Sequence, residues 1–246
     1  SMYAVFHGPK GLKRIASKIH ELTVNLDNAL SKLGIIQLNK NYFDTLLCVG
    51  PCDNIKKIAE INEVNFNYID KEKFSISINE NTTEKDIQLI IDILSKAVDK
   101  KTIGFKINEN ESKIPNKYKR DSSFLNDKIF NLHHSETSLM RYIKRLEKKD
   151  LSLTHSMISL GSCTMKLNAA SEMIPLSWSK WNNIHPYVPV NQAEGYQQLL
   201  KMLEVQLNEI TGFSGTSLQP NSGAQGEYAG LMVIREYLKS ISQENR

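Results

Sequence analysis

QPNSGAQGEY, residues 219–228, is a polar turn with two glycines that runs directly into an apolar helical segment, residues 228–234. Gly223 and Gly226 allow the backbone to turn tightly and to approach a ligand closely. The first amide groups of a helix lack intrahelical partners and carry partial positive charge, so the stretch predicts a phosphate-binding helix start. Ser222 adds a hydroxyl group. From these residues alone, an ordinary capped helix start is the alternative.

Three further motifs precede this stretch in the chain. They are HSMISLGSCTMKLN at 155–168, IHPYVP at 184–189 and QAEGYQQL at 192–199. Together with residues 219–228 they closely resemble the P-protein of the glycine cleavage system, the pyridoxal-phosphate-dependent glycine decarboxylase. SMYAVFHGPKG at 1–11 and LHHSETSLMRY at 132–142 are similar to the same family. The resemblance covers nearly the whole chain and is most specific between residues 132 and 238.

The resemblance implies the fold of aspartate-aminotransferase-like pyridoxal-phosphate enzymes (fold type I), in which a large α/β domain with a mostly parallel sheet accompanies a small α+β domain. Residues 1–99 would form the small α+β domain of the family's first half, and residues 100–127 a connector. Residues 128–246 would begin the cofactor-binding large domain of the second half. In the family, the lysine that carries the cofactor as a Schiff base lies beyond residue 246. We therefore expect a middle part of a longer polypeptide, incomplete in fold and inactive by itself.

For the parent protein, the resemblance implies decarboxylation of glycine with pyridoxal 5'-phosphate and transfer of the aminomethyl group to the lipoyl arm of H-protein. It also implies a homodimer of the parent chain. One alternative is another pyridoxal-phosphate-dependent decarboxylase or aminotransferase of the same fold. Residues 161–168 and 219–228 argue against it, because generic relatives share only a Ser-Gly type of cradle. The other alternative is a truncated, non-catalytic chain that binds H-protein or an intact subunit.

The resemblance assigns residues of this chain to two parts of an active site. Contacts to the cofactor phosphate are expected from Ser222, Gly223, Ala224 and Gln225. The substrate side is expected to contain Cys163, Thr164, Lys166 and His185. Lys166 would attract a carboxylate or the arm of a partner domain. A small buried thiol is the alternative for Cys163, and Gly226 is expected to permit close backbone packing rather than to touch a ligand.

The composition is that of an ordinary globular protein, with 40% hydrophobic and 24% charged residues among 246. Residues 1–150 carry 25 basic and 20 acidic side chains, and this mixture of signs is typical of a solvated surface rather than of a nucleic-acid-binding face. No apolar run approaches the roughly 20 residues that span a bilayer. The sequence therefore predicts neither a nucleic-acid nor a membrane partner.

Neither the cysteines nor the histidines have the spacing of a metal site. Cys48 and Cys52 are separated by Val-Gly-Pro after a predicted strand, which is a poor geometry for a zinc or redox pair. His133, His134 and His155 have no carboxylate or cysteine at ligand spacing, so they are interpreted as structural or surface residues. Three sparse cysteines favour a reducing compartment, either a bacterial cytoplasm or a mitochondrial matrix.

Hydrophobic periodicity predicts the elements of the first half. A helix over 9–33 is begun by Pro9 after a His-Gly-Pro turn and is closed by Gly34. A strand is predicted over 43–49, a helix over 54–62 and a hairpin from 65–68 and 73–78. Residues 82–86 are predicted to cap a further helix, whose apolar face runs from Ile87 to Val98. The polar residues 99–127 are expected to be partly extended or mobile.

In the second half, helices are predicted over 135–149 and 194–211, the latter ended by Gly212, with a loop over 156–168 between them. Trp178, Trp181 and Tyr187 are expected in an irregular, buried crossing segment. The apolar face of the 194–211 helix is expected to lack its packing partners within this chain.

Overall fold

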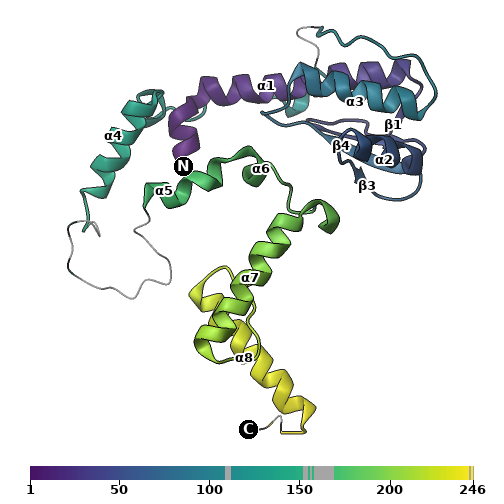
Figure 1. The fold of residues 1–246 in the computed structure, drawn as a ribbon. Coiled ribbons are helices and arrows are strands. Elements are labelled where there is room, and N and C mark those ends of the chain that lie inside the picture. Colours follow the sequence, from purple (N-terminus) through teal and green to yellow (C-terminus); the bar gives the residue numbers. More distant parts are fainter. Residues whose placement is uncertain (109–111, 152–154, 156, 158–168, 244, 246) are drawn as a thin grey trace. The chain divides into compact units, whose positions relative to one another are not determined.

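The computed structural model describes residues 1–108, 112–151, 155, 157, 169–243 and 245 (Figure 1). The chain divides into two compact units, Ser1–Leu146 and Glu147–Arg246. The domain boundaries expected at residues 99 and 127 stay predictions. Among the described residues, the strands form one four-stranded antiparallel sheet in the order β1-β2-β4-β3. This agrees with a small α+β part, whereas no mostly parallel sheet is found in the part of the chain that the structure describes.

α1 (Met2–Lys32) contains the predicted turn near its start. Gly8 has φ 61° and ψ 179°, which interrupts the helical conformation, and Pro9 begins the long helical part. The helix ends at the C-cap residue Leu33, and Gly34 follows with φ 72°. The sequence therefore predicted both ends of the long part correctly, because proline and glycine mark such ends by their backbone preferences.

The sheet consists of β1 (Ile36–Gln37), β2 (Thr45–Val49), β3 (Asn67–Tyr68) and β4 (Lys73–Ser77). β2 pairs antiparallel with β4, so that Leu46 lies opposite Ile76 and Cys48 opposite Phe74. All four side chains are buried. Because alternate residues of a strand point to opposite faces, this register places them on one buried face. The predicted hairpin is confirmed, but the two-residue β1 was not predicted.

Two further helices complete the core of the first unit, α2 (Cys52–Ile61) and α3 (Glu84–Ala97). The predicted cap of α3 is present, because Thr83 Oγ1 accepts a hydrogen bond from the Asp86 amide at 3.3 Å and Asp86 Oδ2 accepts one from the Thr83 amide at 2.7 Å. α3 contacts both α1 and α2. The buried apolar side chains of these helices and of the sheet form one core, which includes Leu22, Leu26, Leu30, Ile55, Ile87, Ile91 and Leu94.

The segment after α3 is not a free connector. Ile103, Phe105 and Ile107 are partly buried and pack against the core. These three residues alternate along the chain, as expected for an extended segment with one face on the protein. This alternation was not predicted from the sequence, because residues 99–127 are polar overall. A short 3-10 turn, η1 (Asn116–Tyr118), follows.

The start of α1 contacts η2 (Lys128–Asn131), which precedes α4 (Glu136–Glu147). His134 Nδ1 donates a hydrogen bond to the Phe6 carbonyl at 2.6 Å. The ring of His133 stacks on Tyr142 with centroids 4.6 Å apart. These two histidines therefore make structural contacts within the first unit. In the described part of the chain, no group of three or more His, Cys, Asp or Glu residues is arranged to hold a metal ion.

The second unit consists mainly of helices. Short turns of helix come first, namely α5 (Ala170–Met173), η3 (Ile174–Ser177), α6 (Ser179–Asn182) and η4 (Val190–Gln192). α7 (Glu194–Thr211) and α8 (Gly223–Ser240) are the two long helices. The bounds of α7 are those predicted, and Gly212 ends it with φ 72°. None of the described helices has both the length and the apolar character needed to cross a membrane.

Large apolar side chains of the second unit are exposed. Trp178 is 55% exposed and Tyr187 is 91% exposed, so the prediction of a buried crossing segment was wrong for these two residues. On α7, Leu199, Leu203 and Ile210 are exposed, as expected for a face without its packing partners. The physical reason is the same at both places: one layer of helices cannot cover its own apolar face without a second layer.

The Cys48 thiol gives a test of the first unit's core. Burial, with a smaller contribution from the Asp27 carboxylate, raises its pKa from 9.0 to about 12. Because thiol reagents attack the thiolate, native Cys48 is expected to be alkylated at pH 8 on the order of 1,000 times more slowly than an ordinary thiol. Mapping iodoacetamide adducts by mass spectrometry checks this, with the urea-unfolded chain as control. Rapid native labelling of Cys48 would contradict it.

The same pKa shift predicts a pH dependence of stability. The folded chain holds the Cys48 proton more tightly than the unfolded chain. The stabilisation associated with this proton is therefore complete below about pH 9 and is lost as the pH rises from about 9 toward 12. Urea unfolding of the chain and of a Cys48→Ala variant across this pH range would separate the contribution of the Cys48 proton to stability from that of other groups.

Candidate functional site

Ser222 is the N-cap residue of α8, which agrees with the capped helix start that the sequence offered as one interpretation. Ser222 has extended backbone angles, φ −155° and ψ 165°, and occupies the N-cap position. Its Oγ accepts a hydrogen bond from the Gln225 amide at 3.2 Å. The Gln225 side-chain Oε1 in turn accepts from the Asn221 amide at 2.8 Å. The two side chains therefore hold the turn and the first helical turn together.

This cap leaves several hydrogen-bond donors free. Gly223 and Ala224 are the first residues of α8, and their amides have no acceptor among the described residues. The Ser222 hydroxyl accepts from Gln225, so its own proton can be donated elsewhere. The Gln225 side-chain NH₂ group is a further donor. No acidic residue lies in the first turn of α8, so the partial positive charge of the helix start is not neutralised there.

Gly226 has no packing role within the described chain. A Cβ atom added at this position would meet no heavy atom within 4 Å. The prediction that Gly226 permits close backbone packing is therefore not met by the residues that the structure describes. The face of α8 near its start is also exposed at Tyr228 and Leu231.

His185, predicted on the substrate side, lies in an exposed turn. Its Nδ1 accepts a hydrogen bond from the Tyr187 amide at 3.1 Å, and the Val188 amide donates to the His185 carbonyl at 2.9 Å. Since Nδ1 is an acceptor, the proton of the neutral ring is on Nε2. The rings of His185 and Tyr187 are 5.8 Å apart. His185 therefore presents a donor nitrogen at the surface of the second unit.

The other three predicted substrate-side residues, Cys163, Thr164 and Lys166, lie outside the described residues. Their predicted roles stay predictions, as does the grouping of all four with the start of α8.

One contact that the sequence did not reveal holds the segment before α7. Tyr196, on the first turn of α7, donates a hydrogen bond from its hydroxyl to the Trp181 carbonyl at 2.7 Å. The two rings meet edge to face, with centroids 4.8 Å apart. Tyr196 and Trp181 are each conspicuous aromatic residues in the sequence, but their pairing across 15 positions was not predictable from spacing.

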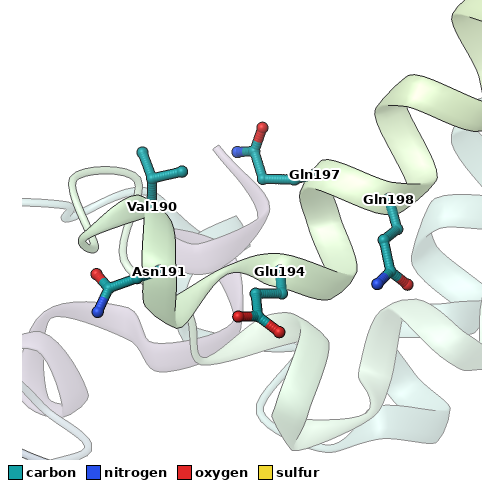
Figure 2. Close-up of a pocket in the computed structure, with 5 residues that line it drawn as sticks. All are labelled: Val190, Asn191, Glu194, Gln197 and Gln198. Atoms are coloured by element: carbon teal, nitrogen blue, oxygen red, sulfur yellow. The ribbon is translucent and has the colours of Figure 1, made fainter.

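A hollow lies beside η4 and the first turns of α7, away from the predicted phosphate contacts. Figure 2 shows that its side chains point in different directions rather than converging on one point; they are Val190, Asn191, Glu194, Gln197 and Gln198. Only Glu194 among them is charged. The start of α8, with its free amide and hydroxyl donors, is therefore the better candidate site.

Three of the proteins similar to this chain have the same name. Residues 1–94 match the family model described as glycine cleavage system P-protein. The chain is 59% identical over 245 residues to the glycine dehydrogenase (decarboxylating) of Flavobacterium johnsoniae, and 57% identical over 245 residues to that of Christiangramia forsetii. Each match covers 100% of this chain and 26% of the relative. The protein of the same name from Bacteroides thetaiotaomicron is 49% identical over 248 residues. The chain thus spans about a quarter of the length of these relatives.

Proposed function

We propose that this chain takes part in the decarboxylation of glycine. Over its whole length it is homologous to part of glycine dehydrogenase (decarboxylating), the glycine cleavage system P-protein. In a protein of the relatives' full length, glycine would be decarboxylated with pyridoxal 5'-phosphate, and the aminomethyl group would pass to the lipoyl arm of H-protein. A homodimer of that protein and, given the bacterial relatives, a cytoplasmic location belong to the same proposal.

The observation that carries the proposal is the donor set at the start of α8. A phosphate group has several acceptor oxygens, and a helix start supplies amide donors together with partial positive charge. Here the amides of Gly223 and Ala224, the hydroxyl of Ser222 and the side-chain NH₂ of Gln225 are available at one capped turn. The residues present therefore fit the phosphate of the cofactor.

We assign the following roles to this chain's residues. Ser222 and Gln225 fix the turn and donate to phosphate oxygens, while Gly223 and Ala224 offer backbone amides without a side chain large enough to block the approach. When bound, pyridoxal phosphate supplies the electron-withdrawing ring on which loss of carbon dioxide depends. Lys166, His185, Cys163 and Thr164 are proposed to line the side on which glycine and the lipoyl arm enter.

Two substitutions at Ser222 separate phosphate binding from helix capping. Aspartate is as good an N-cap as serine, so Ser222→Asp should keep the start of α8 but repel a phosphate through its negative charge. Ser222→Ala should weaken the cap by about 1 kcal/mol. It should also weaken cofactor binding by at least about tenfold, since a hydrogen bond to a charged group is worth about 1.5–3 kcal/mol. In a full-length protein, cofactor titration by absorbance should rank affinities as wild type, then Ala, then Asp.

Ser240→Ala is the matched control on the same helix. Ser240 lies at the other end of α8, where its hydroxyl donates to the Tyr237 carbonyl at 2.6 Å, so cofactor affinity should not change. Glycine-dependent release of carbon dioxide in the presence of lipoylated H-protein should fall in the same order as cofactor affinity. If Ser222→Asp binds the cofactor as tightly as wild type, the phosphate is not held at α8.

A further inference from the structure

We call residues 103–108 and 112–114 the strap. Side chains of α1 and α3 bind this segment to the rest of the first unit. Gln88 makes two bonds to the strap: its Nε2 donates to the Ile103 carbonyl at 3.1 Å, and its Oε1 accepts from the Phe105 amide at 2.6 Å. Asn25 likewise accepts from the Asn108 amide at 2.8 Å and donates to the Asn108 carbonyl at 3.3 Å. Both anchors are side-chain amides, which do not titrate in the physiological range.

The third anchor, His20, is chemically different. Its side chain is buried, with 5% exposed, and its ring stacks on Phe43 with centroids 6.0 Å apart. Nδ1 lies 2.8 Å from the Phe43 carbonyl oxygen, which can only accept, so Nδ1 carries a proton. Nε2 lies 3.0 Å from the Lys113 amide nitrogen, which can only donate, so Nε2 carries a lone pair. Both bonds exist together only when the imidazole is neutral.

We propose that His20 is a proton-sensitive latch that holds the strap at Lys113 only while its ring is neutral. Protonation of Nε2 replaces an acceptor with a donor that faces the Lys113 N–H. Protonation therefore favours release of the strap at Lys113, whereas the amide anchors at Gln88 and Asn25 are unaffected.

Ionisable residues stand on each element around His20. Glu21 follows it on α1, and Asp27 lies seven residues after His20 along the same face of that helix. Tyr42, whose ring centroid is 6.0 Å from that of His20, and Asp44 precede β2, and Lys113 is on the strap. The Asp27 carboxylate accepts from the Tyr42 hydroxyl at 2.7 Å, and Asp44 accepts from the Thr45 hydroxyl at 3.0 Å. One helical turn to either side, His20 is followed by Thr23 and Val24 and preceded by Ala16 and Ser17, none of them charged.

Amide hydrogen exchange of the full chain tests this latch at single-residue resolution. The protection factor of the Lys113 amide is expected to fall by up to about tenfold per pH unit as the pH is lowered toward the midpoint at which the His20 ring signals titrate, and to stay low below it, because only the neutral ring holds the strap. The amides of Phe105 and Asn108 serve as internal controls and should keep their protection factors. Equal protection of Lys113 above and below the His20 midpoint would overturn the proposal.

Two variants test whether His20 is the group responsible for the pH dependence. His20→Gln can offer Lys113 a side-chain oxygen that does not titrate, so Lys113 protection should lose its pH dependence. Asn25→Ala should lower Asn108 protection equally at every pH and leave the pH dependence of Lys113 in place. If the His20→Gln chain folds and its Lys113 amide still loses protection with the wild-type midpoint, another group is responsible and the latch is wrong. If His20→Gln does not fold, the wild-type chain still tests the proposal. The pH at which the Lys113 amide loses protection must then coincide with the midpoint of the His20 ring signals.

Discussion

The Phe74→Ala variant is expected to lose about 3–5 kcal/mol of folding free energy, the range for truncating a fully buried phenylalanine. Phe74 is 0% exposed and lies on β4 opposite both Cys48 and Tyr68. Its ring is 5.9 Å from that of Phe66, centroid to centroid. Its neighbours across the sheet, Cys48 on β2 and Tyr68 on β3, are held in place by the strand pairing, so the cavity would persist. This loss is a large part of the total stability of a domain, which is about 5–15 kcal/mol.

Ile61→Ala is the matched control for this core variant. Ile61 is the last residue of α2 and is 74% exposed, so its truncation should change stability by no more than about 0.5 kcal/mol. Both variants can be compared by urea unfolding, with exchange of the core amides of β2 and β4 as a readout specific to the first unit. A Phe74→Ala chain as stable as Ile61→Ala would mean that the sheet is not covered as described.

Gly8→Ala is expected to cost about 3 kcal/mol or to detach η2 from α1. Gly8 has φ 61° with ψ 179°, a region almost restricted to glycine, where another residue is strained by about 1–3 kcal/mol. An added Cβ would also lie 2.5 Å from the Phe130 carbonyl oxygen and 2.8 Å from His134 Cε1. The first neighbour is backbone and cannot rotate away, so the clash adds to the strain.

Two readouts distinguish these results for Gly8→Ala. Urea unfolding reports the loss of stability, and the ring signals of His134 report whether its bond to the Phe6 carbonyl survives. Gly104→Ala is the control within the same unit, because a Cβ there would meet nothing within 4 Å and φ is not in the left-handed region. Gly8→Ala with wild-type stability and an unchanged His134 signal would show that the kink at Gly8 is not fixed by its surroundings.

The candidate site was predictable only as a local structure. Ser222 as an N-cap and the stop at Gly212 follow from residue types at neighbouring positions. The helix itself begins at Gly223, five residues before the apolar segment 228–234 that the sequence indicated. Gln225 stands three positions after the serine, as in a capping box, but its side chain accepts from the Asn221 amide rather than from that of Ser222. Lys166 and His185 are far from this turn in the sequence, and residue spacing does not predict whether such distant residues meet. Their role beside the start of α8 therefore stays a proposal.

The sequence by itself determined the elements and their ends. The Gly8-Pro9 turn, the cap at Thr83, the hairpin before it and the bounds of α7 follow from backbone preferences and periodicity, which act within a few residues. The sequence also carries, in a specific order along the chain, the motifs on which the resemblance to the glycine cleavage system P-protein rests.

Only the tertiary structure decided which distant residues meet and which faces stay uncovered. It paired His20 with Lys113 and Gln88 with Phe105, and it placed residues 103–108 on the core although their neighbours are polar. It also left Trp178 and Tyr187 exposed, although large aromatic residues usually indicate burial. The physical reason is that burial is a property of the assembled surface: a side chain is covered only where another layer is present, and the residues of that layer are not its neighbours in sequence.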